Sequence, residues 1–151
     1  MIAIVDYDAG NLKSVEKALA YLGENCEITR DIEKIRSAEK VILPGVGAFG
    51  DCMKNLRATG LIPTIKQEIS NGKKFLGICV GLQILFESSE ESPDAEGLGI
   101  FQGHVQKIHA DLKIPQIGWN ALDIKNFDGV FKNSKQISYS MLNRKKFSRR
   151  N

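Results

Sequence analysis

Hydrophobic residues in the first half of the chain form short, nearly unbroken runs that alternate with stretches of helical spacing. Four such runs lie at residues 2–6, 26–29, 40–43 and 74–78. Their length and apolar character are typical of strands that are buried on both faces of a parallel sheet. Between the first two runs, one helix face carries Leu12, Val15, Leu19 and Leu22. The alternation predicts an α/β fold, a three-layer sandwich with a mainly parallel sheet.

The helix boundaries and the second half of the chain are less regular. Asn11 and Asp31 can cap the first two helices, and Asp51 is expected to cap the next one. Residues 87–97 are acidic and rich in turn formers, so we expect a mobile connection there, followed by β-like pieces at 103–108 and 116–124. Residues 132–151 contain no convincing strand, so we divide the chain into a main domain, 1–131, and a basic tail.

Composition limits the possible classes of protein. The 151 residues suffice for one domain, and the longest apolar run, 75–86, is too short to span a bilayer. Without a basic leader at the start, we expect a soluble, cytoplasmic protein without membrane contacts. The tail holds seven of the 21 basic residues and no acidic one, but it lacks interleaved aromatic residues, so we predict no nucleic-acid partner.

Three cysteines, Cys26, Cys52 and Cys79, lack the spacing of a metal site, so we expect free thiols, no metal and no cofactor. Cys79 stands in the pattern G-x-C-x-G, directly after the fourth apolar run. Small residues on both sides allow a strand to turn sharply into a helix and expose the middle side chain. The helix end would favour a thiolate, and the N–H of Val80 would face a developing oxyanion. An ordinary buried cysteine between two packing glycines also fits this pentapeptide.

The third apolar run leads into a second glycine-rich loop, Pro44-Gly45-Val46-Gly47. Glycines in such a loop allow backbone N–H groups to turn towards an anionic ligand. In a parallel α/β sheet this loop and the Cys79 turn both follow strand ends, so we expect them to face one cleft at the carboxyl edge. One loop would supply donors and the other the thiol.

Several motifs together resemble the glutamine amidotransferase subunit of imidazole glycerol phosphate synthase, the HisH family. They are D-Y-D-A-G-N-L at 6–12, P-G-V-G-A-F at 44–49, G-I-C-V-G-L-Q at 77–83, G-L-G-I-F at 97–101 and I-P-Q-I-G-W-N at 114–120. The resemblance is collinear from Met1 to about Ile124. It implies a class I amidotransferase fold, with the closing C-terminal segment missing from this sequence.

The resemblance also implies a reaction and a partner. Glutamine would be hydrolysed to glutamate and ammonia, and the ammonia would pass to a (β/α)8-barrel cyclase that makes imidazole glycerol phosphate in histidine biosynthesis. Cys79 would be the nucleophile, and the residues of the oxyanion hole would be Val46, Gly47 and Val80. Gly47 and Gln83 would contact glutamine, whereas Asn11 and Trp119 would lie at the interface of a heterodimer.

The resemblance predicts a histidine and a glutamate, in an H-x-E segment late in the chain, to complete a catalytic triad with the cysteine. Neither is found, because both histidines, His104 and His109, precede the 114–120 motif. His109 and Asp111 spell H-x-D, but we interpret His109 as a surface residue in a turn and His104 as a polar residue of a strand. We therefore expect an impaired glutaminase step.

Two smaller departures from the family pattern are Asp8, where glycine is usual, and Gln116, where histidine is usual. Three alternatives to a glutaminase subunit stay open: a non-catalytic protein that binds the cyclase, an ammonia donor to another acceptor such as a surface sugar, and an unrelated cysteine hydrolase. The basic ending could arise from a frameshift, a premature stop or a genuine terminus.

Overall fold

The computed structural model describes residues 1–107, 117–124, 137–143 and 146–148. The chain divides into two compact units, one containing Met1–Lys107 and the other lying within Ile108–Lys146. In the described residues no helix combines the length and the apolar character needed to cross a membrane. The candidate site lies entirely in the first unit.

A four-stranded parallel sheet forms the centre of the first unit. Its strands are β1 (Ile2–Val5), β2 (Cys26–Thr29), β3 (Lys40–Gly45) and β4 (Lys74–Cys79), in the order β2-β1-β3-β4. All four agree closely with the apolar runs of the sequence, and β3 extends two residues further, through Pro44 and Gly45. The parallel register pairs Gly45 with Cys79, so the two glycine-rich loops leave the sheet side by side.

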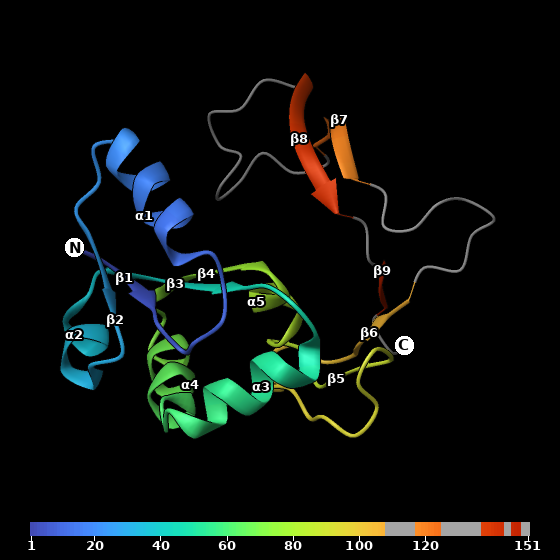
Figure 1. Cartoon of the computed structure of the whole chain (residues 1–151), viewed down its shortest axis with the longest axis horizontal. Helices are drawn as coiled ribbons and strands as arrows, with labels where there is room; N and C mark the ends of the chain where they lie inside the picture. The colour runs from blue at the N-terminus through green and yellow to red at the C-terminus, as the bar shows by residue number, and fades with distance from the viewer. Residues whose placement is uncertain (108–116, 125–136, 144–145, 149–151) are drawn as a thin grey trace. The chain divides into compact units, whose positions relative to one another are not determined.

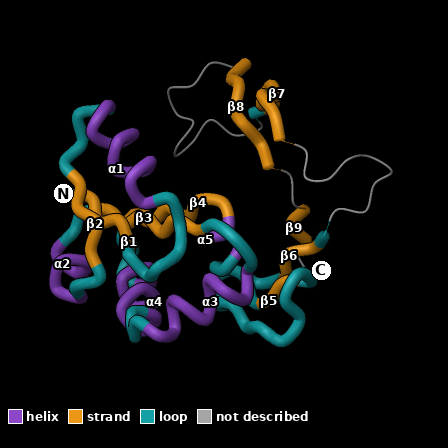
Figure 2. The backbone as a smooth tube through the Cα atoms, viewed as in Figure 1, coloured by secondary structure: helices purple, strands orange, loops and turns teal. Residues whose placement is uncertain are grey.

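Helices cover both faces of this sheet, as the three-layer prediction required (Figure 1). Helix α1 (Leu12–Tyr21) lies on one face. The other face carries α2 (Ile32–Ser37), α3 (Phe49–Ala58) and α4 (Ile62–Ser70), as Figure 2 also shows. The core lies between that second face and its helices, and its largest fully buried side chains include Tyr7, Phe49, Ile35, Leu43, Met53, Leu56, Leu61 and Ile65.

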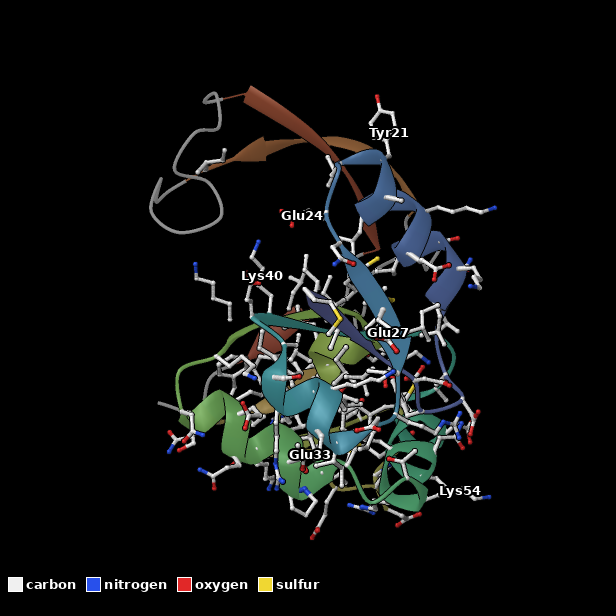
Figure 3. The ribbon with its side chains drawn as sticks, turned by 90° about the vertical axis from the view of Figure 1, so that its left-hand side faces the viewer. Tyr21, Glu24, Glu27, Glu33, Lys40 and Lys54 are labelled. Atoms are coloured by element: carbon white, nitrogen blue, oxygen red, sulfur yellow. The ribbon has the colours of Figure 1, made fainter. Side chains whose placement is uncertain are left out.

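Helix α1 is present and capped as expected, because the Asn11 side chain accepts a hydrogen bond from the Ser14 N–H at 3.2 Å. Its apolar face is nevertheless less buried than the spacing suggested. No residue of α1 is fully buried, Leu22 is 71% exposed, and Tyr21 is 92% exposed and points outward in Figure 3. Periodicity predicts a helix, but it does not predict how closely the helix packs.

Three other expectations need correction. Helix α3 begins at Phe49 after Ala48, so Asp51 lies in its first turn and is not its cap. The apolar residues Leu82, Ile84, Leu85 and Phe86 were expected to continue as a helix after Cys79, but the helix there is only α5 (Val80–Gln83). Two strands, β8 (Ile137–Asn143) and β9 (Lys146–Ser148), occur in a segment where we predicted none. Apolar and polar residues alternate from Ile137 to Met141, a strand pattern that the basic composition concealed.

The remaining strands form two small sheets. Strand β5 (Ser88–Ser89) pairs in parallel with β6 (His104–Gln106) in a sheet that also contains β9. In the second unit, β7 (Ile117–Asp123) and β8 form an antiparallel pair in which Trp119 is opposite Met141. The β-like character predicted for 103–108 and 116–124 is therefore confirmed for the described parts of both stretches. The domain boundary at Phe131 stays a prediction.

Candidate functional site

Cys79 occupies a sharp turn between strand β4 and helix α5. Its backbone has φ +56°, in the left-handed region that non-glycine residues rarely adopt, and Val80 begins α5 immediately afterwards. The cysteine is exposed, whereas Val80 and Gly81 are buried. A strained turn that presents one reactive side chain is the geometry predicted from G-x-C-x-G, and it argues against a buried packing cysteine.

The two glycines of this motif are required by close packing. A Cβ atom on Gly81 would lie 1.9 Å from the Leu43 carbonyl oxygen, and one on Gly77 would lie 2.6 Å from the Cα of Leu82. Both distances are far below ordinary van der Waals contact. Glycine at both positions therefore lets α5 fold back directly against β3 and β4.

The Pro44–Gly47 loop lies against the Cys79 turn. A Cβ atom on Gly45 would lie 2.4 Å from the Gly81 backbone nitrogen, so the two backbones are nearly in contact. Beyond Gly45 the chain emerges from the core, and both Val46 and Gly47 are exposed. Gly47 has φ +92° with no atom within 4 Å of an added Cβ, so its conformation, and not crowding, requires glycine. The two loops predicted to face one cleft thus lie side by side.

Two buried side chains form hydrogen bonds with backbone carbonyls of this loop. The Tyr7 hydroxyl donates a hydrogen bond to the Pro44 carbonyl, and the Cys52 thiol donates to the Val46 carbonyl at 3.3 Å. Both side chains are fully buried, and burial is the main cause that raises the pKa of each above its ordinary value. Both groups therefore keep their protons and remain donors at neutral pH.

Two further contacts fix the chain just after the loop, and sequence reasoning missed them. The N–H groups of Phe49 and Gly50 donate to the Glu91 carboxylate at 3.2 Å and to the Ser92 hydroxyl at 3.1 Å. These acceptors serve as the cap that Ala48 does not provide. They come from the acidic stretch that we expected to be mobile, where nearby Ser89 is buried in β5. The only sequence signal was the absence of a capping side chain at position 48.

In the part of the chain that the structure describes, the other non-glycine residue with positive φ is Asp8, at +59° in the loop after β1. This conformation explains why glycine is usual at this position in the family that the sequence resembles. Here the Arg30 guanidinium pairs with Asp8 at 2.9 Å and with Asp6 at 2.8 Å. The hydrogen bond from Arg30 is the main cause that lowers the pKa of the Asp6 carboxyl. The ion pairs stabilise a turn that the aspartate alone would strain.

The other residues singled out from the sequence are distributed more widely. Gln83 is the last residue of α5 and is 6% exposed, and Asn11 caps α1. His104 lies half-buried in β6, outside the four-stranded sheet, with its ring 3.3 Å from the Gln106 side-chain amide. His109, Asp111 and Gln116 lie outside the described residues, and so does the side chain of Trp119.

Comparison with known protein families gives a match to one family model. The model of "Glutamine amidotransferase class-I" matches residues 3–147, a range that extends beyond the last of the sequence motifs, at 114–120. Two solved structures are similar in fold over 99% of the chain: "Crystal structure of glutamine amidotransferase", with a TM-score of 0.75 and 18% identity, and "Structure of PurLQS from Thermotoga maritima", with 0.70 and 21%. The chain covers 75% and 69% of those two structures. At this identity they show the fold alone.

Curated relatives are much more similar in sequence. The imidazole glycerol phosphate synthase subunit HisH of Caldanaerobacter subterraneus subsp. tengcongensis is 50% identical over 139 residues, which are 92% of this chain. That of Rhodopirellula baltica is 51% identical over 128 residues, or 83% of this chain. The chain spans 68% and 62% of the lengths of these two relatives. The chain therefore belongs to the class I glutamine amidotransferase family, within its HisH group.

Proposed function

We propose that this chain provides the glutamine-hydrolysing part of an imidazole glycerol phosphate synthase. Glutamine and water would give glutamate and ammonia, and a partner cyclase barrel would consume the ammonia in histidine biosynthesis. The proposal rests chiefly on the exposed Cys79, held at a strained turn beside the Pro44–Gly47 loop. The names of the curated relatives support the choice of pathway.

In this proposal Cys79 carries the covalent step. Its sulfur would attack the side-chain amide carbon of glutamine, forming an S–C bond while the amide oxygen becomes an oxyanion. Collapse of this intermediate would break the C–N bond and release ammonia, which leaves with a proton and yields a thioester. Water would then cleave the thioester to glutamate and restore the thiol.

Backbone donors would stabilise the negative oxygen. The N–H groups of Val46, Gly47 and Val80 are the proposed donors, because they belong to the two adjacent loops at the carboxyl edge of the sheet. Removing one such donor typically slows acyl transfer by ~10²–10³. Gln83, together with Gly47, would bind the rest of the glutamine molecule.

A general base is needed both to deliver a proton to the leaving ammonia and to activate water. The two histidines of the 151 residues, His104 and His109, both precede the 114–120 motif, so we assign neither this role. Losing acid–base catalysis typically costs ~10²–10⁴ in rate. Because both the formation and the hydrolysis of the thioester need this group, we expect glutamine turnover by the 151-residue chain to be nearly absent.

The test is glutamate release by the 151-residue chain with and without imidazole as an external base. We expect slow release that imidazole accelerates, and neither the basal nor the accelerated rate should survive Cys79→Ala. Release that persists in Cys79→Ala would overturn the proposal. Release abolished by His109→Ala would instead give His109 the role of the base.

Thiol reactivity provides an independent check of Cys79. With limiting iodoacetamide, Cys79 should be alkylated first because it is exposed, whereas Cys26 is partly buried. Cys52 should react last, since it is buried and burial raises the pKa of its thiol. Earlier labelling of Cys26 or Cys52, mapped by peptide mass spectrometry, would contradict the proposed nucleophile.

The partner assignment is tested separately. We propose that Asn11 and Trp119 contribute to the cyclase interface, so Trp119→Ala should weaken co-purification with the cyclase of the same organism while the far-UV circular dichroism stays unchanged. Unchanged co-purification would contradict this interface. Normal binding by a chain that forms no thioester would favour the alternative, a non-catalytic cyclase-binding protein.

A further inference from the structure

The carbonyl of Val46 points into the protein, where a buried thiol binds it. Cys52 lies in the first half of α3 with no exposed surface, and its sulfur is 3.3 Å from the Val46 oxygen. The thiol donates to this carbonyl, so the contact favours the direction in which the carbonyl faces Cys52.

The direction of this carbonyl also determines the direction of an N–H group. Val46 C=O and Gly47 N–H belong to one peptide unit, which is planar, and in a trans peptide they point in opposite directions. With the carbonyl held towards buried Cys52, the Gly47 N–H is directed away from it, towards the exposed side of the loop. No atom lies within 4 Å of the position that a Cβ on Gly47 would take, so packing on that side of the residue does not hold the peptide.

The other side-chain hydrogen bonds to this part of the backbone are made before and after the Val46–Gly47 peptide. The Tyr7 hydroxyl holds the Pro44 carbonyl, two residues before Val46. On the other side, Glu91 and Ser92 bind the N–H groups of Phe49 and Gly50. Cys52 supplies the side-chain contact to the peptide unit that lies between these two anchored positions.

We propose that Cys52 is a positioning residue, whose thiol orients the Val46–Gly47 peptide so that the Gly47 N–H serves as an oxyanion donor. This inference rests on the proposed function, because it assigns a cause to one donor of that site. Cys52 itself does not touch the substrate. The burial that raises the pKa of its thiol suits this role, since only the protonated form donates to the carbonyl.

The test uses a substrate whose leaving group needs no protonation by a general acid. Attack of Cys79 on the γ-p-nitrophenyl ester of glutamate forms the S–C bond, breaks the C–O bond and releases p-nitrophenolate, a leaving group that needs no added proton. Oxyanion formation still precedes its release. The burst of p-nitrophenolate therefore reports the acylation rate of the 151-residue chain, and the rate of iodoacetamide alkylation at Cys79, a displacement without an oxyanion, serves as the reference.

We expect Cys52→Ala to slow the burst by ~10–10², somewhat less than complete loss of a donor, while alkylation of Cys79 stays unchanged. Cys52→Ser, which restores a hydroxyl donor, should recover the burst to within about threefold of the original rate. Cys26→Ala is the matched control, because the Cys26 thiol also faces a carbonyl, that of Glu16 at 3.9 Å, and lies in β2. Its burst should be unchanged.

Each result distinguishes the two claims. A burst equal in Cys52→Ala and the original chain would overturn the positioning role and leave the proposed function intact. Equal slowing of burst and alkylation in both Cys52 variants would also overturn it, since that pattern indicates general loss of structure. Absence of any burst in the original chain would instead refute the proposed function.

Discussion

The buried ion pair between Lys73 and Glu68 gives the sharpest prediction about stability. The Lys73 ammonium lies 2.7 Å from the Glu68 carboxylate, and the two side chains are only 10% and 11% exposed. The ammonium also donates to the carbonyls of Ile35 and Arg36 in the last turn of α2. Lys73, directly before β4, therefore links the end of α2 to α4.

Replacing Lys73 with methionine leaves the Glu68 carboxylate buried without its cation. Breaking such a pair typically lowers the free energy of unfolding by 3–5 kcal/mol, and we expect about 3 kcal/mol because the pair retains slight exposure. The double variant Lys73→Met/Glu68→Leu removes both charges, so it should lose much less, about 1 kcal/mol. The exposed pair Lys40–Glu24, 3.4 Å apart with side chains 41% and 46% exposed, provides the control.

Urea unfolding followed by far-UV circular dichroism measures these differences. With a slope of about 2 kcal/mol per molar, Lys73→Met should lower the midpoint by about 1.5 M. Lys40→Met should shift it by less than about 0.3 M, because exposed pairs contribute little. Equal shifts for Lys73→Met and Lys40→Met, or a double variant as unstable as Lys73→Met, would refute the reasoning.

Three further predictions concern the loops of the site. The hydrogen bond from Arg30 lowers the pKa of Asp6, so the stability that this carboxylate contributes is present above the pKa of the unfolded carboxyl, about 3.9, and is lost as the pH falls through the lower folded value. Asp6→Asn should therefore flatten the acid side of a pH–stability curve. An unchanged curve would contradict the pairing. Asp8→Gly should change the free energy of unfolding by less than about 0.5 kcal/mol, because the relief of the positive φ offsets the loss of the ion pair with Arg30. A larger loss in thermal unfolding would contradict this. Gly81→Ala should lower the free energy of unfolding by about 3 kcal/mol, because the added Cβ would overlap the Leu43 carbonyl. A decrease below about 1 kcal/mol in urea unfolding would show that the turn can relax.

The parallel sheet could be predicted because its strands are signalled by local hydrophobic runs. Each of the first four apolar runs became a strand, and the glycine-rich loops at 44–47 and 77–81 lie where parallel topology places them. These features depend on short segments whose composition leaves few alternatives. The β8 strand at Ile137–Asn143 could not be predicted from composition, because its alternating residues lie within a basic segment that has few large apolar side chains.

The contacts that support the site could not be predicted, since they join residues far apart in sequence. Glu91 reaches Phe49 across 42 positions, and Tyr7 reaches Pro44 across 37. Neither a propensity nor a motif encodes such a pairing, which depends on how the finished layers pack. Even the Cys52 contact with Val46, only six positions apart, required knowing that α3 begins at Phe49 and not near Asp51.

The central claim is that Cys79 is the nucleophile of an acyl-transfer site, and the location of the acyl group tests it most directly. The 151-residue chain would be incubated with the γ-p-nitrophenyl ester of glutamate, quenched in acid, digested and analysed by peptide mass spectrometry. The account predicts a hydroxylamine-labile γ-glutamyl thioester on the peptide that contains Cys79, and none in Cys79→Ala. A γ-glutamyl group found on Cys26, on Cys52 or on no cysteine at all would contradict it.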